Sequence, residues 1–211
     1  MKPLEGHISR AFDGALGALH LHVVAMGSLA VDQVRSAVRA YAAWDRGMAR
    51  TVLEREHAIN AYDDALDEEQ LALLARRQPL ASDLRFVIAF SRAVAELERV
   101  GDEAKKIARF VLEDDGPAAG ALPDIVALGV RAEQILHRSL EAFDALDAGL
   151  AAGIVADDKH LDRQYAAAMQ QLLERPATEA VAFRSAVHAA FVLKSLERIG
   201  DHARNIARLL E

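Results

Sequence analysis

Leu97-Glu98-Arg99-Val100-Gly101-Asp102 occurs a second time in the chain, with one conservative change, as Leu196-Glu197-Arg198-Ile199-Gly200-Asp201. The two copies lie 99 residues apart, and nine of the thirteen positions are identical between residues 97–109 and 196–208. Arg85 matches Arg184 at the same shift. A gapless match of this density indicates that the chain is a duplication of one structural unit.

Both copies lie in stretches whose apolar and small residues recur at three- and four-residue steps, the period of an α-helix. In the third predicted helix these are Leu80, Leu84, Val87, Val94, Leu97, Gly101, Ala104, Ala108 and Val111. In the sixth they are Phe183, Ala186, Leu193, Leu196, Gly200, Ala203 and Ala207. The pattern predicts an all-α protein of two pseudo-symmetric three-helix bundles, at residues 1–115 and 121–211. The six helices are expected at about 6–44, 48–76, 80–113, 121–148, 154–174 and 177–210.

Proline and glycine mark the expected breaks between these helices. The five prolines should all lie at helix boundaries, because proline is strongly disfavoured inside a helix. Residues 114–120, Asp-Asp-Gly-Pro-Ala-Ala-Gly, are the predicted linker between the halves. Gly47 is expected to end the first helix, and Gly149 and Gly153 to bracket a break in the second half.

Composition excludes several classes of function. Hydrophobic residues make up 52% of the chain and aromatic residues only 5%, which favours a helical bundle. The net charge of −7 argues against direct nucleic-acid binding, and the absence of cysteine excludes disulfides and thiolate metal sites. The stretch from Gly14 to Val31 has no charged residue, but its glycines and histidines favour a core helix over a membrane span. We therefore expect a cytoplasmic protein, without a signal peptide, that meets membranes only through partners.

The repeated motif places two carboxylates four residues apart in each half, Glu98 with Asp102 and Glu197 with Asp201. Residues at this spacing share a helix face, where like charges repel by a few tenths of a kcal/mol. The motif glycine costs about 1 kcal/mol more relative to alanine. We expect the glycine to let a neighbouring helix approach closely, and the carboxylates to flank the core.

The preceding helix in each half offers further oxygen ligands. Asp158 and Asp162 stand four apart in the second half, and their counterparts at a shift of 102 are Glu56 and Asn60. Clustered carboxylates could bind a hard cation such as Mg²⁺, Ca²⁺, Mn²⁺ or iron. The alternative is a solvated acidic face with the motif arginines as counter-ions.

The sequence also ranks the two halves as metal sites. Asn205 adds an oxygen to the second copy, whereas Lys106 stands at the matching place in the first. The second half is therefore expected to be the better site. A lysine ammonium could partly replace a cation in the first.

At this point the chain resembles the PhoU family, the phosphate-signalling accessory proteins of bacteria. The family hallmark Glu-Arg-Ile-Gly-Asp stands here at residues 98–102 and 197–201, with Asn205 four residues after the second copy. Arg77-Gln78-Pro79 with Ser82-Asp83-Leu84-Arg85 is similar to the family's turn into the third helix. The resemblance covers nearly the whole chain.

The resemblance implies several properties that the spacing does not. Members of the family are usually dimers that bind iron, zinc, manganese or magnesium on their acidic helices. They damp the phosphate-starvation response by linking the phosphate ABC transporter, through its ATPase, to a sensor histidine kinase. By this resemblance the metal-site residues are Glu56, Glu98 and Asp102 in the first half and Asp158, Asp162, Glu197, Asp201 and Asn205 in the second.

Two other functional hypotheses stay open. A carboxylate-bridged metalloenzyme would carry Glu-x-x-His on two helices, and Glu54 with His57 supplies one such match while the equivalent helix supplies none. No nucleophile elbow, glycine-rich phosphate loop or HExxH motif is present, so we expect no enzyme. The second reading is a metal-free helical adaptor that docks through its acidic face.

Overall fold

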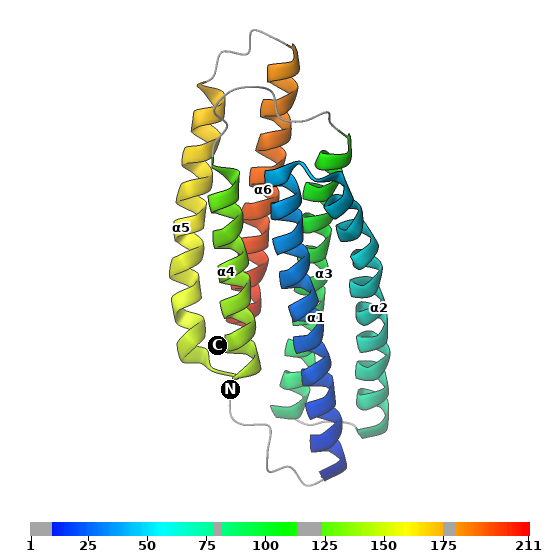
Figure 1. The fold of residues 1–211 in the computed structure, drawn as a ribbon. Coiled ribbons are helices and arrows are strands. Elements are labelled where there is room, and N and C mark those ends of the chain that lie inside the picture. Colours follow the sequence, from blue (N-terminus) through cyan, green and yellow to red (C-terminus); the bar gives the residue numbers. More distant parts are fainter. Residues whose placement is uncertain (1–9, 78–81, 114–123, 175–179) are drawn as a thin grey trace.

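The computed structural model describes residues 10–77, 82–113, 124–174 and 180–211 of the chain. Within these ranges every regular element is an α-helix (Figure 1), which confirms the predicted fold class. All five prolines and the predicted linker at 114–120 lie outside the described residues. The helices are α1 (Arg10–Ala43), α2 (Arg46–Arg77), α3 (Ser82–Glu113), α4 (Ile125–Asp144), α5 (Ala148–Leu173) and α6 (Ala180–Arg208).

The turn between α1 and α2 forms earlier than the glycine signal predicted. Trp44 adopts the left-handed backbone region at φ 51°, which ends α1. The Asp45 carboxylate then accepts a hydrogen bond from the Met48 N–H at 3.0 Å, so Asp45 caps the start of α2. Gly47 lies inside α2, and the prediction that it ends the first helix is wrong.

The turn between α4 and α5 repeats this construction 102 residues later. Leu146 has the same φ of 51°. The Asp147 carboxylate caps α5 by accepting hydrogen bonds from the backbone N–H groups of Gly149 and Leu150, at 2.7 and 3.3 Å. Since an aspartate cap fixes the start of α5 at Ala148, Gly149 and Gly153 are helical and do not bracket a break. The helices predicted at 121–148 and 154–174 are therefore α4 at Ile125–Asp144 and α5 at Ala148–Leu173.

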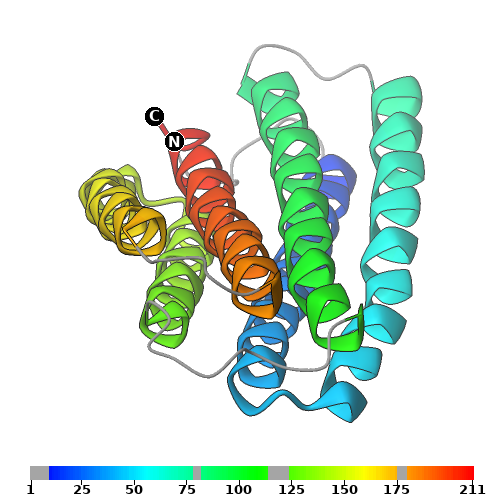
Figure 2. The same cartoon turned by 90° about the horizontal axis from the view of Figure 1, so that it is seen from above.

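The six helices form one continuous bundle with the two halves side by side. Within each half the three helices pack on one another, and the halves meet where α3 packs on α6 and α1 on α4. Viewed from above, α2 and α5 lie at opposite edges and the other four helices fill the middle (Figure 2). The repeated motif therefore lies on α3 and α6, which are central helices.

The uncharged stretch of α1 lies in the core of this bundle. Leu16, Val23 and Met26 are fully buried, as the sequence analysis predicted. By length and composition alone α1 also qualifies as a possible membrane span, and it is the one helix in the described ranges that does so. At Gly27 the absence of a side chain admits Leu140 of α4, since a methyl group there would overlap the Leu140 side chain.

Most of the two predicted apolar stripes are buried, but Leu84 and Phe183 near their starts are not, and Leu80 lies outside the described residues. The predicted stripe faces the core from Val87 onward in α3 and from Leu193 onward in α6, and Ala186 is half-buried. Leu84 is 38% exposed and Phe183 is 59% exposed, which contradicts their predicted place in the core. Figure 1 shows the reason for Phe183: the first turns of α6 extend past the start of α4, so that helix does not cover them.

Candidate functional site: two acidic helix junctions

The motif glycines bring each motif helix close to its outer neighbour, as predicted. A methyl group at Gly101 would lie 3.2 Å from the Ile59 side chain of α2. At Gly200 it would overlap the side chain of Leu161 on α5. Ile59 and Leu161 are themselves 102 residues apart, so the two junctions, α2–α3 and α5–α6, are equivalent structures. The carboxylates of each junction are held in place by this close packing.

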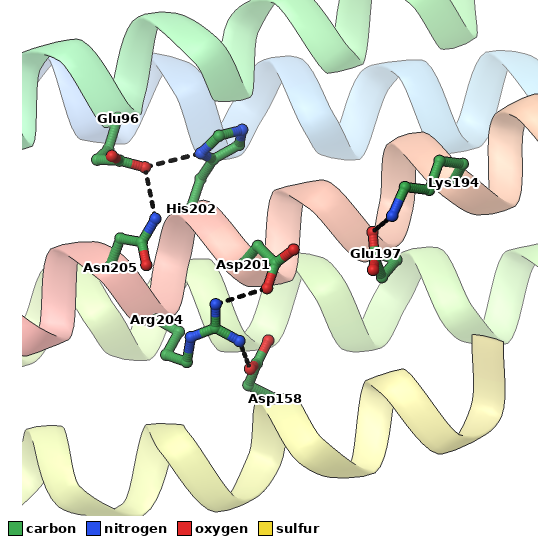
Figure 3. Close-up of polar contacts among 8 residues, drawn as sticks. All are labelled: Glu96, Asp158, Lys194, Glu197, Asp201, His202, Arg204 and Asn205. Carbon is green, nitrogen blue, oxygen red and sulfur yellow. Dashed lines mark hydrogen bonds and ion pairs between the residues drawn. The ribbon is translucent and has the colours of Figure 1, made fainter. Parts of the chain in front are cut away.

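In the second half, a guanidinium lies among the carboxylates. Asp158 of α5 is completely buried, and Arg204 of α6 donates a hydrogen bond to its Oδ2. The same guanidinium pairs with Asp201 at 2.7 Å (Figure 3). Burial raises the pKa of Asp158 and the carboxylates of Asp162 and Asp201 raise it further, against the opposing effect of Arg204. Arg204 therefore acts as the counter-ion of a desolvated carboxylate.

Of the other two acids of this junction, Asp162 and Glu197, Glu197 has a counter-ion of its own. Glu197 accepts a hydrogen bond from Lys194 at 2.6 Å, and the Lys194 ammonium also lies 5.5 Å from the centre of the Tyr165 ring on α5. The hydrogen bond from Lys194 to Glu197 raises the pKa of the lysine. The second-half cluster, Asp158, Asp162, Glu197 and Asp201, thus includes two cationic side chains.

In the first half, Lys105 takes the place that Arg204 takes in the second. Lys105 precedes Arg204 by 99 residues. Its ammonium pairs with the buried Glu56 of α2 and lies 3.3 Å from Asp102. Sequence reasoning missed both basic residues, although an Asp-x-x-Lys or Asp-x-x-Arg step follows the motif in each copy.

Glu98 lies among other carboxylates, and α2 places no basic side chain beside it. Burial raises the pKa of Glu98, and Asp102, Asp63 and Glu56 raise it further, against the opposing effect of Arg99. Asp63 of α2 was also missed by sequence reasoning, although it lies two helical turns after Glu56 on the same side of the helix. The pKa of Asp63 is itself raised by burial and by its neighbours Asp67 and Asp64. The first-half cluster is Glu56, Asp63, Glu98 and Asp102, with Lys105 as its cation.

Three residues on which the ranking of the halves rested lie elsewhere. Asn205 donates its amide N–H to Glu96 of α3 at 3.1 Å, away from Asp158 (Figure 3). Lys106 pairs with Glu103 at 2.9 Å and does not stand in the acidic cluster. Asn60 is exposed on α2. Asn205 and Lys106 were expected beside the carboxylates, but their side chains contact Glu96 and Glu103 of α3 instead.

Asn205 and Lys106 instead belong to a polar contact between the two halves. Glu96 of α3 accepts hydrogen bonds from Asn205 and from His202 of α6, whose Nδ1 lies at 2.7 Å. Glu103 of α3, nearly fully buried, pairs with Arg198 of α6 at 3.2 Å. These contacts span about half the chain in sequence and join the halves across α3 and α6.

The oxygen atoms of the two clusters suit a hard cation, but basic side chains already lie among them. Their ligand atoms are carboxylate oxygens, which Mg²⁺, Mn²⁺ and ferric iron prefer. The buried Oδ1 of Asp158 has no hydrogen-bond partner, so this oxygen is free to coordinate a cation. Within the described ranges, however, no three Asp, Glu or His side chains are arranged to hold an ion together. A cation would therefore have to displace Arg204 or Lys105.

Comparison with known proteins identifies the two halves. The family model described as "PhoU domain" matches twice, at residues 23–111 and 125–210. A phosphate-specific transport system accessory protein PhoU homolog of Pseudomonas aeruginosa is 39% identical over 98% of this chain and 86% of its own length. The phosphate-specific transport system accessory protein PhoU of Escherichia coli is 35% identical over 98% and 86%.

Solved structures agree with these matches. The crystal structure of PhoU from Pseudomonas aeruginosa superposes with a TM-score of 0.90 at 39% identity, and the match covers 94% of this chain and 96% of that one. The phosphate transport system regulatory protein PhoU from Streptococcus pneumoniae superposes with a TM-score of 0.86 at 28% identity, covering 94% of each chain. By sequence and by fold, the chain belongs to the PhoU family.

Proposed function

We propose that this chain is a negative regulator of the phosphate-starvation response. A role in phosphate transport follows from its family, whose relatives are named as accessory proteins of the phosphate-specific transport system. The finer proposal is that the chain links the ATPase of the phosphate ABC transporter to a sensor histidine kinase and restrains phosphate uptake. The observation that carries it is the match over nearly the whole chain, both motif copies included.

The proposed mode of action is binding, without catalysis. The basic side chain at the centre of each acidic junction is engaged in an ion pair that joins two helices, Arg204 with Asp158 and Lys105 with Glu56. We propose a cytoplasmic homodimer that reaches the membrane through its partners. The net charge of −7 supports protein partners over nucleic acid.

Gene replacement tests the regulatory proposal. In a bacterium whose own PhoU-family gene is deleted, a phosphate-repressed phosphatase should stay active in high phosphate. Expression of this chain should restore repression. Persistent phosphatase activity, with the chain present at the level of the native protein, would contradict the proposal.

We further propose that the junctions bind a hard divalent or ferric cation when their basic side chain moves aside. Glu56, Asp63, Glu98 and Asp102 would hold it in the first half, and Asp158, Asp162, Glu197 and Asp201 in the second. When bound, the cation would supply positive charge among these carboxylates. Asn205 is left out, since its amide donates to Glu96.

A metal-free adaptor is the second candidate, and the ion pairs of Arg204 and Lys105 favour it. In that case these two side chains are the permanent counter-ions of the clusters. Metal content after chelation and reconstitution separates the candidates. Loss of bound metal in the double variant Glu197→Ala/Asp201→Ala would support a second-half metal site, whereas undiminished occupancy would exclude those ligands.

A further inference from the structure

The outer surface where α3 meets α6 carries a row of basic side chains on an acidic protein. Arg85, Arg92, Arg99 and Lys106 follow one another along α3 at intervals of seven residues, and all four are exposed. Seven residues make nearly two helical turns, so these side chains project from one side of the helix. In the described part of the chain, Arg85 and Arg92 form no ion pair. Their charge is therefore available to a partner.

The neighbouring helix adds to this row. Arg184 and Arg198 of α6, the repeat equivalents of Arg85 and Arg99, are also exposed. The pairing of Arg198 with Glu103 of α3 places it at the boundary between the two helices. We call the surface formed by Arg85, Arg92, Arg99, Lys106, Arg184 and Arg198 the seam face. The acids beneath it, Glu96 and Glu103, have side chains only 14% and 3% exposed and are already paired, so the charge presented outward is positive.

The seam face also includes an aromatic patch. Because α3 and α6 run in opposite directions (Figure 1), the end of α3 lies beside the first half of α6. There Phe110 of α3 stacks on Phe191 of α6, with ring centres 5.9 Å apart, and contacts His188 at 5.0 Å. Phe191 is nevertheless 58% exposed. Its repeat equivalent is Arg92, so Phe191 places an apolar side chain between Arg184 and Arg198 on α6, where α3 has an arginine.

We infer that the seam face is a docking surface for an acidic amphipathic helix of a partner protein. Carboxylates at heptad spacing on such a helix would meet the row of arginines, and an apolar side chain would cover Phe191. The flanking clusters argue against a phosphate backbone or an anionic membrane. Glu98 and Asp102 on α3, and Glu197 and Asp201 on α6, would repel any anionic surface broader than one helix. The inference deepens the proposed function, since it assigns a surface to the protein-binding role.

A synthetic helical peptide tests the inference directly on the full chain. The probe carries glutamates at heptad spacing beside leucines, and its control carries lysines in place of the glutamates. We expect the glutamate peptide to bind and the lysine peptide not to bind, by fluorescence anisotropy. Arg92→Glu should weaken binding at least about tenfold through like-charge repulsion, and Phe191→Ala about fivefold through the lost apolar contact. Arg50→Glu, which reverses an exposed arginine on α2, is the matched control and should bind as wild type does.

Besides a failure of the glutamate peptide to bind wild type, three results would overturn the inference. They are equal binding of the two peptides, equal effects of Arg92→Glu and Arg50→Glu, and tighter binding of single-stranded DNA or anionic vesicles than of the glutamate peptide. Circular dichroism shows whether each variant remains helical. Failure of the proposed function is seen separately, as wild-type chain that does not restore phosphatase repression. If wild type represses but does not bind the glutamate peptide, the seam-face inference fails and the proposed function stands.

Discussion

The α2–α3 junction and the α5–α6 junction share one construction and differ in charge. In both, a motif glycine admits an aliphatic side chain of the outer helix, Ile59 or Leu161. Both also place a basic side chain from the motif helix against a buried carboxylate of the outer helix. The duplication has therefore kept the packing and the central ion pair.

The difference lies in the residues around that pair. Where the first half has Asp63 and Ala95, the second has Tyr165 and Lys194 at the equivalent positions. In the first half Lys105 is paired with the carboxylate cluster and Arg99 acts on Glu98 without pairing with it, whereas in the second Lys194 and Arg204 are both paired with the cluster. The first-half junction is the less neutralised of the two, which removes the basis for ranking the second half as the better metal site. Which half binds a cation stays a prediction.

The largest expected difference in stability between the halves follows removal of the basic side chain at the centre of each junction. Arg204→Ala leaves the fully buried Asp158 without a counter-ion and should lower the free energy of unfolding by about 3 kcal/mol at pH 7. Lys105→Ala should cost less, about 1–2 kcal/mol, because the Glu56 side chain keeps 7% exposure. Urea denaturation of both variants and of Arg204→Lys, which retains a cation, measures the difference. Equal stability of Arg204→Ala and wild type would contradict the role of Arg204.

The same variant has a predicted pH dependence. The pKa of Asp158 is already raised above 3.8 in the folded protein, and loss of Arg204 removes the groups that lower it. A carboxyl whose folded pKa is raised takes up a proton more readily folded than unfolded, so its destabilising effect falls as the pH falls. The deficit of Arg204→Ala relative to wild type should therefore shrink between pH 7 and the ordinary aspartate pKa near 4. A deficit that grows on acidification would oppose this assignment.

Adding a methyl group at the motif glycines should affect the stability of the two junctions differently, and this is the next largest effect. Gly200→Ala should destabilise by about 1 kcal/mol, because overpacking against Leu161 outweighs the gain of about 1 kcal/mol in helix propensity. Gly101→Ala should be close to neutral, since Ile59 lies at 3.2 Å from the added methyl and needs to move little. Thermal unfolding of the pair measures this. Equal losses would mean that the two junctions are packed equally tightly.

The smallest predicted effect concerns the motif glutamates. The folded pKa of Glu98 is raised by burial and by neighbouring carboxylates, so its charge destabilises the protein at neutral pH. Glu98→Gln should therefore stabilise by about 0.5 kcal/mol at pH 7, and the gain should vanish as the pH falls below 4.5, the ordinary value. Glu197→Gln is the matched variant and should give no gain, because Glu197 binds Lys194. A larger gain from Glu197→Gln would reverse the comparison of the two halves.

The fold was predictable because its signals are local or repeated. Helical periodicity gave six helices, and the shift of 102 between Glu56 and Asp158 predicted the equivalence that Ile59 and Leu161 now confirm. The two turns were misplaced because glycine was given more weight than the aspartate caps Asp45 and Asp147.

The site was less predictable, for two physical reasons. Lys105 and Arg204 have long side chains that contact the motif aspartate three residues earlier. The angular position of a residue on a helix does not show how far its side chain extends. The contact of Glu96 with His202 spans 106 residues and depends on how α3 meets α6. A single sequence does not specify how α3 and α6 are aligned along each other.

Manganese titration of metal-stripped protein tests most directly whether Lys105 and Arg204 neutralise the acidic junctions in place of a metal. Isothermal calorimetry on wild type, Lys105→Ala and Arg204→Ala compares the sites. Each variant is expected to bind Mn²⁺ at least about tenfold more tightly than wild type, because a cation no longer has to displace a basic side chain. The tighter site is expected in Lys105→Ala, whose cluster then has no cation of its own. Unchanged Mn²⁺ affinity in both variants would contradict the account.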